Sequence, residues 1–303
     1  MAEARIPVDV FNPGQVFACL GLMEVADVLL GGAEGAFDWR AAGDEVFVLQ
    51  AAGERNPLHV ALDFLQQAEL LALVPEGSPH LGKHPKAKTD GEQIPFEVVP
   101  TGAPFPSPDE GADRLPALLR LKTEEKTFEI RVDYWADAAS HTRRDNVKFW
   151  AGAGGYPGVA LLKDAFNLMQ GRWQEAAMDP FDVAVPQSSS FRLDWRRDYV
   201  PLDTGFSLNQ HGHIVTVGYP LVEILAAIGL SHARPKPHDK LSYSYGIIGM
   251  LDDGALYLPM FLRAALGCTS MPFPMRSFRM ALGWPGQEGQ ARCIVNTYEE
   301  NEA

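Results

Sequence analysis

The chain has 303 residues, of which 46% are hydrophobic and 10% aromatic, enough for one large or two modest folded domains. Its formal net charge of -13 argues against a free-standing nucleic-acid-binding protein, because such proteins neutralise phosphates with a basic surface. The charge is uneven, since residues 1–140 carry 11 Lys and Arg against 23 Asp and Glu, and residues 141–303 carry 15 against 16. The second half can therefore contact an anionic partner that the first half repels.

Cysteine usage and hydropathy narrow the class of protein further. Cys19, Cys268 and Cys293 are scattered and form no C-x-x-C pair, which indicates neither a disulfide framework nor a zinc ribbon. The apolar run at residues 15–30 contains two acids, is short for a bilayer span and follows no basic start. We expect a cytoplasmic protein with no signal peptide, no membrane contact, no cofactor and no metal ion.

The most informative stretch reads as a strand, a tight turn and a buried helix. A β-prone run at residues 6–11 stops at Asn12-Pro13-Gly14, and residues 15–30 are apolar except for two acids. Asn12 is a good helix cap, and Pro13 fits the first helical position because its missing N–H would have no partner there. The polar positions form one narrow stripe, so we predict that protein covers the rest of this helix.

Short strands, a helix and an irregular insertion are predicted next. The patterns indicate strands at residues 37–39 and 45–50 and a second helix at residues 57–74. Residues 75–116 contain nine prolines and little periodicity, so we expect an irregular insertion that includes a strand at residues 94–99. We interpret its basic cluster as a solvated loop: Lys83, His84, Lys86 and Lys88.

A basic, aromatic and glycine-rich stretch follows a predicted hairpin of residues 118–134 and leads into a helix at residues 159–169. Its candidate nucleic-acid contacts are Arg143, Arg144, Lys148 and Trp150. Glycines let a backbone approach a phosphate, a helix N-terminus attracts anions, and Trp150 can stack on a base. The stretch lacks the G-K-[ST] ending of a P-loop, and a glycine turn with Trp150 in the core is the alternative interpretation.

Residues 191–199 alternate as a strand with a charged face. Arg192 and Arg196 alternate there with two aspartates, so the pattern fits either a self-paired charge ladder or a nucleic-acid contact. Arg197 falls on the other face, among aromatic residues.

A second strand-turn-helix unit follows at residues 211–230. His211 and His213 share one face of its strand, but no third ligand completes a metal site. After Gly218-Tyr219-Pro220 the helix is almost wholly apolar, and a Gly-Leu pair again follows the proline by about two turns. Two such units indicate an α+β fold of antiparallel sheets and buried helices. A pseudo-duplicated ferredoxin-like arrangement fits them, although unrelated strand-to-helix junctions give the same pattern.

No flexible linker divides the chain, so we expect a single intimate α+β body. Within this body we predict an N-terminal unit at about residues 1–140, a C-terminal unit at about residues 141–297 and a disordered acidic tail at residues 298–303. Within the C-terminal unit, the patterns predict strands at residues 241–249 and 254–262.

Several short motifs of glycine, apolar and aromatic residues are spread over the chain. They are Phe11-Asn12-Pro13-Gly14-Gln15 with Ala18-Cys19-Leu20-Gly21-Leu22, Lys148-Phe149-Trp150-Ala151-Gly152, Gly205-Phe206-Ser207, Tyr219-Pro220-Leu221-Val222-Glu223, and Ile228-Gly229-Leu230 with Arg234-Pro235. Together they resemble a CRISPR-associated protein, the large-subunit-like component of the type I-U (also called I-G) Cascade effector.

The resemblance implies a non-catalytic subunit of an RNA-guided complex for antiviral defence. Such a subunit lies near the 5' end of the guide RNA and helps to check the protospacer-adjacent motif of target DNA. Its partners are the guide RNA, the target DNA, other Cascade subunits and a separate helicase-nuclease. This chain is short for a large subunit and strongly acidic, so its nucleic-acid binding would depend on assembly into the ribonucleoprotein.

Within a complex, a few basic residues suffice to read a short motif, because each bidentate Arg–guanine pair gives roughly 1–3 kcal/mol of discrimination. The candidate nucleic-acid-binding residues are Arg143, Arg144, Lys148, Trp150, Arg192, Arg196, Arg197, Arg276 and Arg279.

Two other functions fit the same sequence. The two strand-turn-helix units also suit a ferredoxin-like RNA-binding subunit or guide-RNA-processing endoribonuclease, although no single His is marked out as a general base. A structural scaffold that touches only protein is the third hypothesis.

Overall fold

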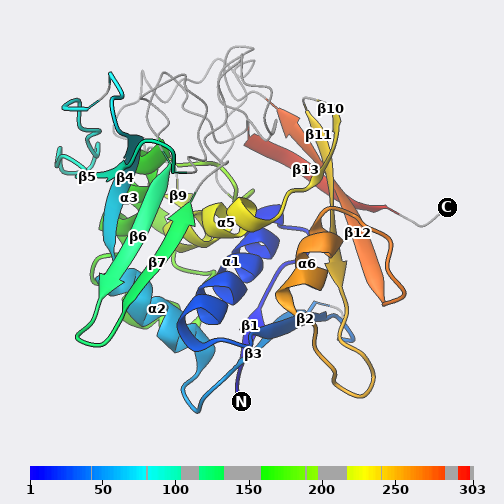
Figure 1. The fold of residues 1–303 in the computed structure, drawn as a ribbon. Helices are drawn as coiled ribbons and strands as arrows, with labels where there is room; N and C mark the ends of the chain where they lie inside the picture. The colour runs from blue at the N-terminus through cyan, green and yellow to red at the C-terminus, as the bar shows by residue number, and fades with distance from the viewer. Residues whose placement is uncertain are drawn as a thin grey trace.

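The computed structural model describes residues 1–41, 43–79, 81–103, 116–132, 158–187, 190–196, 217–239, 241–283 and 293–300, and it confirms an α+β fold (Figure 1). Helix α1 lies at the centre, between a sheet that contains β4 to β7 and another that contains β10 to β13. In chain order the elements are β1 (Ala2–Pro7), α1 (Pro13–Leu30), β2 (Glu34–Asp38), β3 (Val46–Ala51), α2 (Pro57–Gln67), β4 (Glu69–Pro75), β5 (Phe96–Val99), β6 (Ala117–Lys122), β7 (Thr127–Val132), α3 (Gly158–Met169), α4 (Trp173–Met178), β8 (Val185–Pro186), β9 (Val217–Gly218), α5 (Pro220–His232), β10 (Lys236–Asp239), β11 (Ser242–Ile248), α6 (Pro259–Leu266), β12 (Met275–Gly283) and β13 (Cys293–Glu300).

The first part of the chain follows the order strand, helix, strand, strand, helix, strand. Strands β1, β3 and β2 form an antiparallel sheet with β3 in the middle. This is the pairing of the first three strands in a ferredoxin-like fold. The fourth strand, β4, leaves this arrangement and joins a separate sheet of order β5-β4-β6-β7.

The predicted helix at residues 57–74 is half right. Helix α2 ends at Gln67, and the following residues form β4 instead. The run Leu70-Leu71-Ala72-Leu73-Val74 is buried on both faces of a central strand, which pairs antiparallel with β6 and parallel with β5. An apolar run of this length gives no periodicity that separates a helix from a buried strand. Only the pairing with β5 and β6 shows that these residues form a strand.

The C-terminal sheet has the order β10-β11-β12-β13, and all its pairs are antiparallel. The predicted strand at residues 254–262 is wrong, because α6 begins at Pro259. The disordered tail is also wrong for its first residues, since Tyr298, Glu299 and Glu300 belong to β13 and pair with β12. Ion pairs to β12 hold both glutamates in place.

The structure does not confirm pseudo-duplication. The later elements β9, α5, β10, β11, α6 and β12 repeat the order of β1 to β4, but their pairing differs. Strand β9 pairs with β8, and β11 pairs directly with β12, whereas β3 does not pair with β4.

The two apolar helices α1 and α5 cross at the centre of the fold, where neither has room for a side chain. A Cβ built on Gly21 would overlap the backbone of Leu225, and one built on Gly229 would overlap the backbone of Phe17. Because both positions are glycine, the helix backbones come into direct contact. Every residue of α1 from Pro13 to Ala26 is buried, so this helix, although long and apolar enough to span a bilayer, serves as a core helix here.

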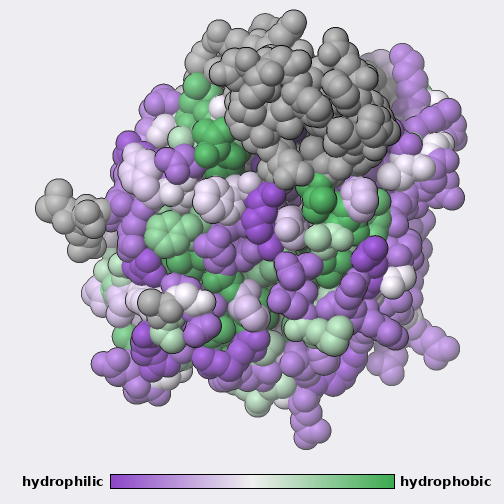
Figure 2. Space-filling view, turned by 180° about the vertical axis from the view of Figure 1, so that it is seen from behind, coloured by the Kyte–Doolittle hydropathy of each residue, from purple (hydrophilic) through white to green (hydrophobic). Residues whose placement is uncertain are grey.

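One hydrophobic cluster extends from Ala4 to Ile294 and includes side chains of both predicted units. A backbone link also joins the two units, because Gly35 of β2 and Tyr257, which precedes α6, exchange N–H···O bonds of 2.8 and 3.0 Å. From behind, the surface is mainly hydrophilic, with smaller hydrophobic areas between polar ones (Figure 2).

The proline-rich insertion packs on α3 through one buried acid. The Asp164 carboxylate accepts hydrogen bonds from the backbone N–H of Lys88 and from the N–H and hydroxyl of Thr89, at 2.8 to 2.9 Å. The predicted strand at residues 94–99 is confirmed in part as β5. The basic side chains Lys83, Lys86 and Lys88 are exposed, as expected of a loop.

Candidate nucleic-acid interface

The structure places four of the nine predicted nucleic-acid-binding residues, and these lie in two regions. Arg192 and Arg196 lie beside the N-termini of α1 and α5, whereas Arg276 and Arg279 lie on β12. The other five lie outside the described residues: Arg143, Arg144, Lys148, Trp150 and Arg197. His211 and His213 also lie outside them.

The first region is a junction where residues 190–196 cross the starts of both central helices. Asn12 caps α1, since its Oδ1 accepts from the N–H of Gly14 at 3.1 Å, and its Nδ2 donates to the Asp194 carboxylate at 2.9 Å. Glu223, in the first turn of α5, accepts from the N–H groups of Leu193 and Asp194 at 2.9 and 3.2 Å. Side chains at the starts of both helices therefore form hydrogen bonds with this segment, at the Asp194 carboxylate and at two backbone N–H groups.

This bonding explains why the predicted strand at residues 191–199 is wrong over its described part. The N–H groups of Leu193 and Asp194 bond to Glu223 rather than to a neighbouring strand. Leu193 and Asp194 are adjacent and both buried, which breaks the alternation of a strand. Arg192 has a left-handed backbone, with φ of 64°, as expected in a turn rather than in a strand.

Arg196 is held by its own protein. Its guanidinium contacts both oxygens of Asp194, with the shortest distance 2.7 Å, and lies 3.5 Å above the centre of the Tyr219 ring. It also borders a groove of about 650 Å³ that five acidic residues line: Asp9, Asp44, Glu45, Asp179 and Asp182. These acids would repel a phosphate, so the setting of Arg196 favours an internal ion pair with Asp194 over a nucleic-acid contact.

Arg192 is mostly buried near the same junction. Burial lowers the pKa of its guanidinium, and the nearby Cys293 and Glu223 oppose that effect. Its backbone N–H donates to the Ser190 hydroxyl at 3.2 Å. Its burial gives it less access to a large ligand than a surface arginine has.

On the inner face of the C-terminal sheet, Arg276 forms a bidentate pair with Glu299 of β13, at 2.7 and 2.8 Å. The hydrogen bonds from Arg276 lower the pKa of the Glu299 carboxyl. The Arg276 guanidinium lies within 6 Å of three aromatic ring centres, those of Phe11, Trp39 and Phe278, at 5.9, 5.6 and 5.1 Å. This arginine therefore joins the sheet to the turn before α1.

The outer face of the same sheet carries a connected polar cluster. Arg279 pairs with Glu300, Nε to Oε1 at 2.8 Å, and the Ser244 hydroxyl donates to the other oxygen of Glu300 at 2.7 Å. The Nε2 atom of His238 lies 2.7 Å from the same hydroxyl. Lys236 is the cross-strand partner of Ser244, is exposed, and has no ion pair among the described residues. We call Lys236, His238, Ser244, Arg279 and Glu300 the outer-face cluster.

Ser244 is poorly placed to act as a nucleophile. Its hydroxyl donates to the Glu300 carboxylate at 2.7 Å. The Nε2 atom of His238 lies 2.7 Å from that hydroxyl and 3.3 Å from Nη2 of Arg279, so the tautomer of the imidazole sets whether it donates or accepts. Ser244 is also only 1% exposed. The cluster is arranged to hold an anion rather than to activate a serine.

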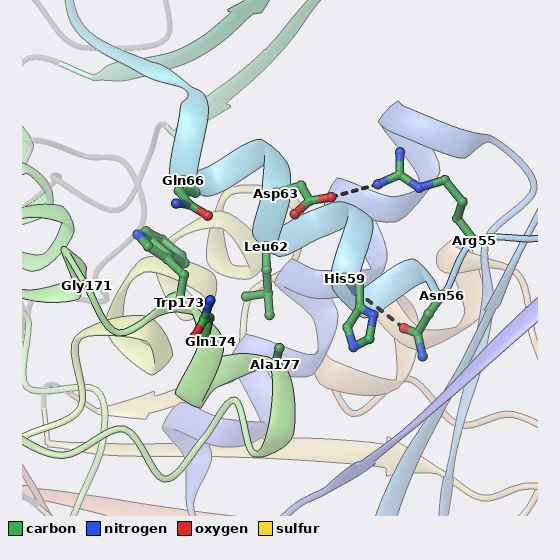
Figure 3. A pocket seen from close by; sticks show the side chains of 10 residues that line it. All are labelled: Arg55, Asn56, His59, Leu62, Asp63, Gln66, Gly171, Trp173, Gln174 and Ala177. Atoms are coloured by element: carbon green, nitrogen blue, oxygen red, sulfur yellow. Dashed lines mark hydrogen bonds and ion pairs between the residues drawn. The ribbon is translucent and has the colours of Figure 1, made fainter.

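A separate groove of about 760 Å³ opens between α2 and α4 (Figure 3). The Arg55–Asp63 ion pair, at 2.7 Å, leaves the charged part of the lining balanced. Trp173 forms part of the wall and is 7% exposed, and its Nε1 has no hydrogen-bond partner in the described part of the chain. The remaining polar lining residues are uncharged amides and one imidazole: Asn56, His59, Gln66 and Gln174. This composition suits a neutral polar ligand.

Sequence reasoning missed this groove and the acidic partners of β12. The groove had a weak signal, because Asn56, His59, Asp63 and Gln66 recur at helical spacing on one face of α2. The acids at the end of β13 read as a tail because they lie in a short acidic run at the end of the sequence. Among the described residues, no group of three or more His, Cys, Asp or Glu could hold a metal ion.

Comparison with protein-family models, with curated proteins and with solved structures finds no match for this chain.

Proposed function

We propose that this protein is a non-catalytic subunit of a type I CRISPR RNA-guided surveillance complex, where it contributes to recognition of the guide RNA 5' end and of the protospacer-adjacent motif. The proposal rests first on the resemblance of its motifs to the large-subunit-like component of the type I-U effector.

The observation that carries the proposal is that motifs from distant parts of the sequence meet in space. Asn12 and Gly14 contact residues 193–195, and the Glu223 carboxylate accepts from the N–H groups of Leu193 and Asp194. Gly21 and Gly229 then form the crossing of the two helices. Four of the motifs that carry the resemblance therefore belong to one structural unit at the centre of the fold. The Lys148-to-Gly152 and Gly205-to-Ser207 motifs lie outside the described residues.

The charge distribution supports a role inside an assembly. An acidic protein gains little from binding nucleic acid alone, but a complex can supply most of the contacts while a local site adds a few. Among the described candidates, Arg279 has the setting that best fits a phosphate contact, because it lies on an outer face that also carries exposed Lys236, two strands away.

Co-purification tests the proposal most directly. The tagged full-length chain is expressed with its genomic neighbours, and the bound proteins and RNA are identified. Recovery in a ribonucleoprotein that contains guide RNA is the expected result. Recovery as an RNA-free monomer would contradict it.

Charge reversal tests the predicted contacts that lie outside the described residues. Arg143→Glu with Arg144→Glu should weaken target-DNA binding by the assembled complex without unfolding the chain. Arg55→Glu is a control for charge reversal at an exposed arginine of the N-terminal unit, because Arg55 pairs with exposed Asp63 in the described part of the chain. Unchanged target affinity in the double variant would remove these residues from the interface.

A ferredoxin-like RNA-binding or guide-RNA-processing subunit is the second candidate, and one observation favours it. The β1-α1-β2-β3-α2 segment has the strand order β1-β3-β2 of that fold. Incubation of the purified protein with repeat RNA separates the two functions, because only a processing enzyme cuts at a defined position. A complex that binds its target after all nine candidate residues are replaced would favour a protein-only scaffold instead.

A further inference from the structure

The Glu300 carboxylate occupies a site that is built to hold an anion. One oxygen accepts from the Arg279 guanidinium, with Nε and Nη2 at 2.8 and 2.7 Å, and the other accepts from the Ser244 hydroxyl at 2.7 Å. The Nε2 atom of His238 lies 2.7 Å from that hydroxyl and 3.3 Å from Nη2 of Arg279, so the imidazole contacts both groups that hold Glu300. Ser244 is buried on the central strand β11, so the pairing of the sheet, rather than Glu300, sets its position.

These donors match a phosphate as well as a carboxylate. A guanidinium presents two parallel N–H groups that fit either anion, and a hydroxyl adds a third donor to the same oxygens. Exposed Lys236 lies across from Ser244 on the neighbouring strand and adds positive charge at the rim. The described strands of this sheet carry three acids: Glu300 itself, Glu299 on the inner face, and Asp239, whose carboxylate accepts from the N–H of Leu241.

We propose that a phosphodiester of single-stranded nucleic acid binds at the outer-face cluster and replaces the Glu300 carboxylate there. The end of β13 thus acts as an internal competitor that keeps Arg279 neutralised until nucleic acid arrives. The proposal extends the proposed function, because it names the contact that the arginine of β12 makes.

Exposure makes the exchange possible. The side chains of Arg279 and Glu300 are 32% and 28% exposed, so an incoming phosphate can reach the pair from solvent. Partly exposed ion pairs contribute little net stability, so their exchange for another anion costs little. Glu300 is also near the end of the edge strand β13, where its side chain can turn away while Tyr298 and Thr297 stay paired with β12.

Glu299 provides a matched control. It carries the same charge and is adjacent in sequence, but it faces the inner side of the sheet, where it pairs with Arg276. A general effect of removing one negative charge from the end of β13 would appear in both variants. An effect of opening the anion site would appear only at Glu300.

The test measures the affinity of full-length wild-type, Glu300→Gln and Glu299→Gln proteins for fluorescent oligouridine and oligothymidine over a range of salt concentrations. We expect Glu300→Gln to bind roughly two- to fivefold more tightly than wild type, as loss of a competing ion pair predicts, and Glu299→Gln to bind like wild type. Arg279→Gln in the Glu300→Gln background should abolish the gain and lower the salt slope by about 0.7, the value for one single-strand phosphate contact.

The two probes separate the possible sources of the phosphate. Equal gains for RNA and DNA indicate recognition of the phosphodiester alone, and a gain for oligouridine only assigns the site to RNA. Equal affinities of the Glu300 and Glu299 variants would overturn the proposal. If thermal denaturation shows that Glu300→Gln is unstable, the single variant Arg279→Gln tests the proposal instead. An unchanged salt slope for this variant would also overturn the proposal.

The outcome is independent of the proposed function. Wild-type protein that co-purifies with guide RNA but shows no gain on Glu300→Gln keeps the function and removes this site. A gain on Glu300→Gln in a chain that never recovers guide RNA keeps the site and removes the function.

Discussion

Gly21 of α1 and Gly229 of α5 occupy reciprocal positions where the two helices cross. A Cβ on Gly21 would overlap the carbonyl of Leu225, four residues before Gly229, and a Cβ on Gly229 would overlap the carbonyl of Phe17, four residues before Gly21. Each glycine therefore contacts the backbone of the opposite helix, one turn before the glycine of that helix. This contact fixes how closely the two apolar helices approach, and through them the two sheets on either side.

Gly21→Ala and Gly229→Ala should each destabilise the protein, because backbone atoms rather than mobile side chains block the added methyl group. We expect a loss of about 1–3 kcal/mol in the free energy of unfolding, as for other overpacked cores. Urea denaturation followed by circular dichroism measures it. Gly267→Ala is the control, since its Cβ would meet only atoms at 3.5 Å or beyond, and a loss there equal to that at Gly21 would refute this account.

Asn12→Asp should destabilise the junction even though aspartate caps helices as well as asparagine does. The substitution replaces the Nδ2 donor, 2.9 Å from the Asp194 carboxylate, by an oxygen that repels it. We expect a loss of about 1–3 kcal/mol, the range for a buried group left without its partner. Adding Asp194→Asn restores a donor and should recover part of the loss. Equal stability of Asn12→Asp and the wild type in urea would show that this hydrogen bond is unimportant.

Glu24 and Arg263 should respond unequally to the loss of each other. The Glu24 side chain is 3% exposed, whereas that of Arg263 is 36% exposed and can turn into water. Arg263→Met leaves a buried carboxylate and should cost about 3–5 kcal/mol, whereas Glu24→Gln should cost about 1–2 kcal/mol. The two unfolding free energies are compared in urea at neutral pH, and a larger cost for Glu24→Gln would contradict the explanation.

His232 should make stability depend on pH near neutrality. Burial lowers the pKa of its imidazole below the usual value of 6.5, and Arg263 and Arg234 act in the same direction, while Glu24 opposes them. The unfolded chain therefore binds a proton more readily than the native one, so native stability is full above pH 6.5 and falls as the pH drops through that value. His232→Gln should reduce the difference in melting temperature between pH 7.5 and pH 5.5. An unchanged difference would assign the pH dependence to other groups.

Arg196→Gln should lower stability, whereas Arg279→Gln should not change it measurably. Arg196 joins Asp194, Tyr219 and the carbonyl of Phe181 at the centre of the junction, and the loss of these contacts should cost about 1–3 kcal/mol. Arg279 forms a partly exposed pair at a sheet surface. Thermal denaturation of both variants checks this, and equal melting temperatures would refute the distinction.

Local sequence was sufficient where one residue pattern allows only one structure. Asn12-Pro13 at a strand end predicts the start of α1, and the alternation in residues 127–132 predicts β7, because capping and period-two burial act within a few residues. The boundary between α2 and β4 was missed because a continuous apolar run fits either element.

The candidate site also has features that local sequence predicts and features that it does not. The sequence marked Arg192, Arg196, Arg276 and Arg279 as possible nucleic-acid contacts, but it gave no way to tell them apart. Their partners lie 2 to 23 residues away in sequence, and the distant ones come together only through strand pairing. Arg196 is thereby committed to the junction, and Arg279 is left on an outer face.

The sequence by itself determined that this is an acidic α+β protein with two apolar helices, because composition, capping and periodicity depend on neighbouring residues alone. The tertiary structure decided that these helices cross through paired glycines and that the acidic end of the chain forms a strand. Both features need contacts between residues about 20 to 200 positions apart, and the free energy of such contacts depends on packing that no local pattern encodes.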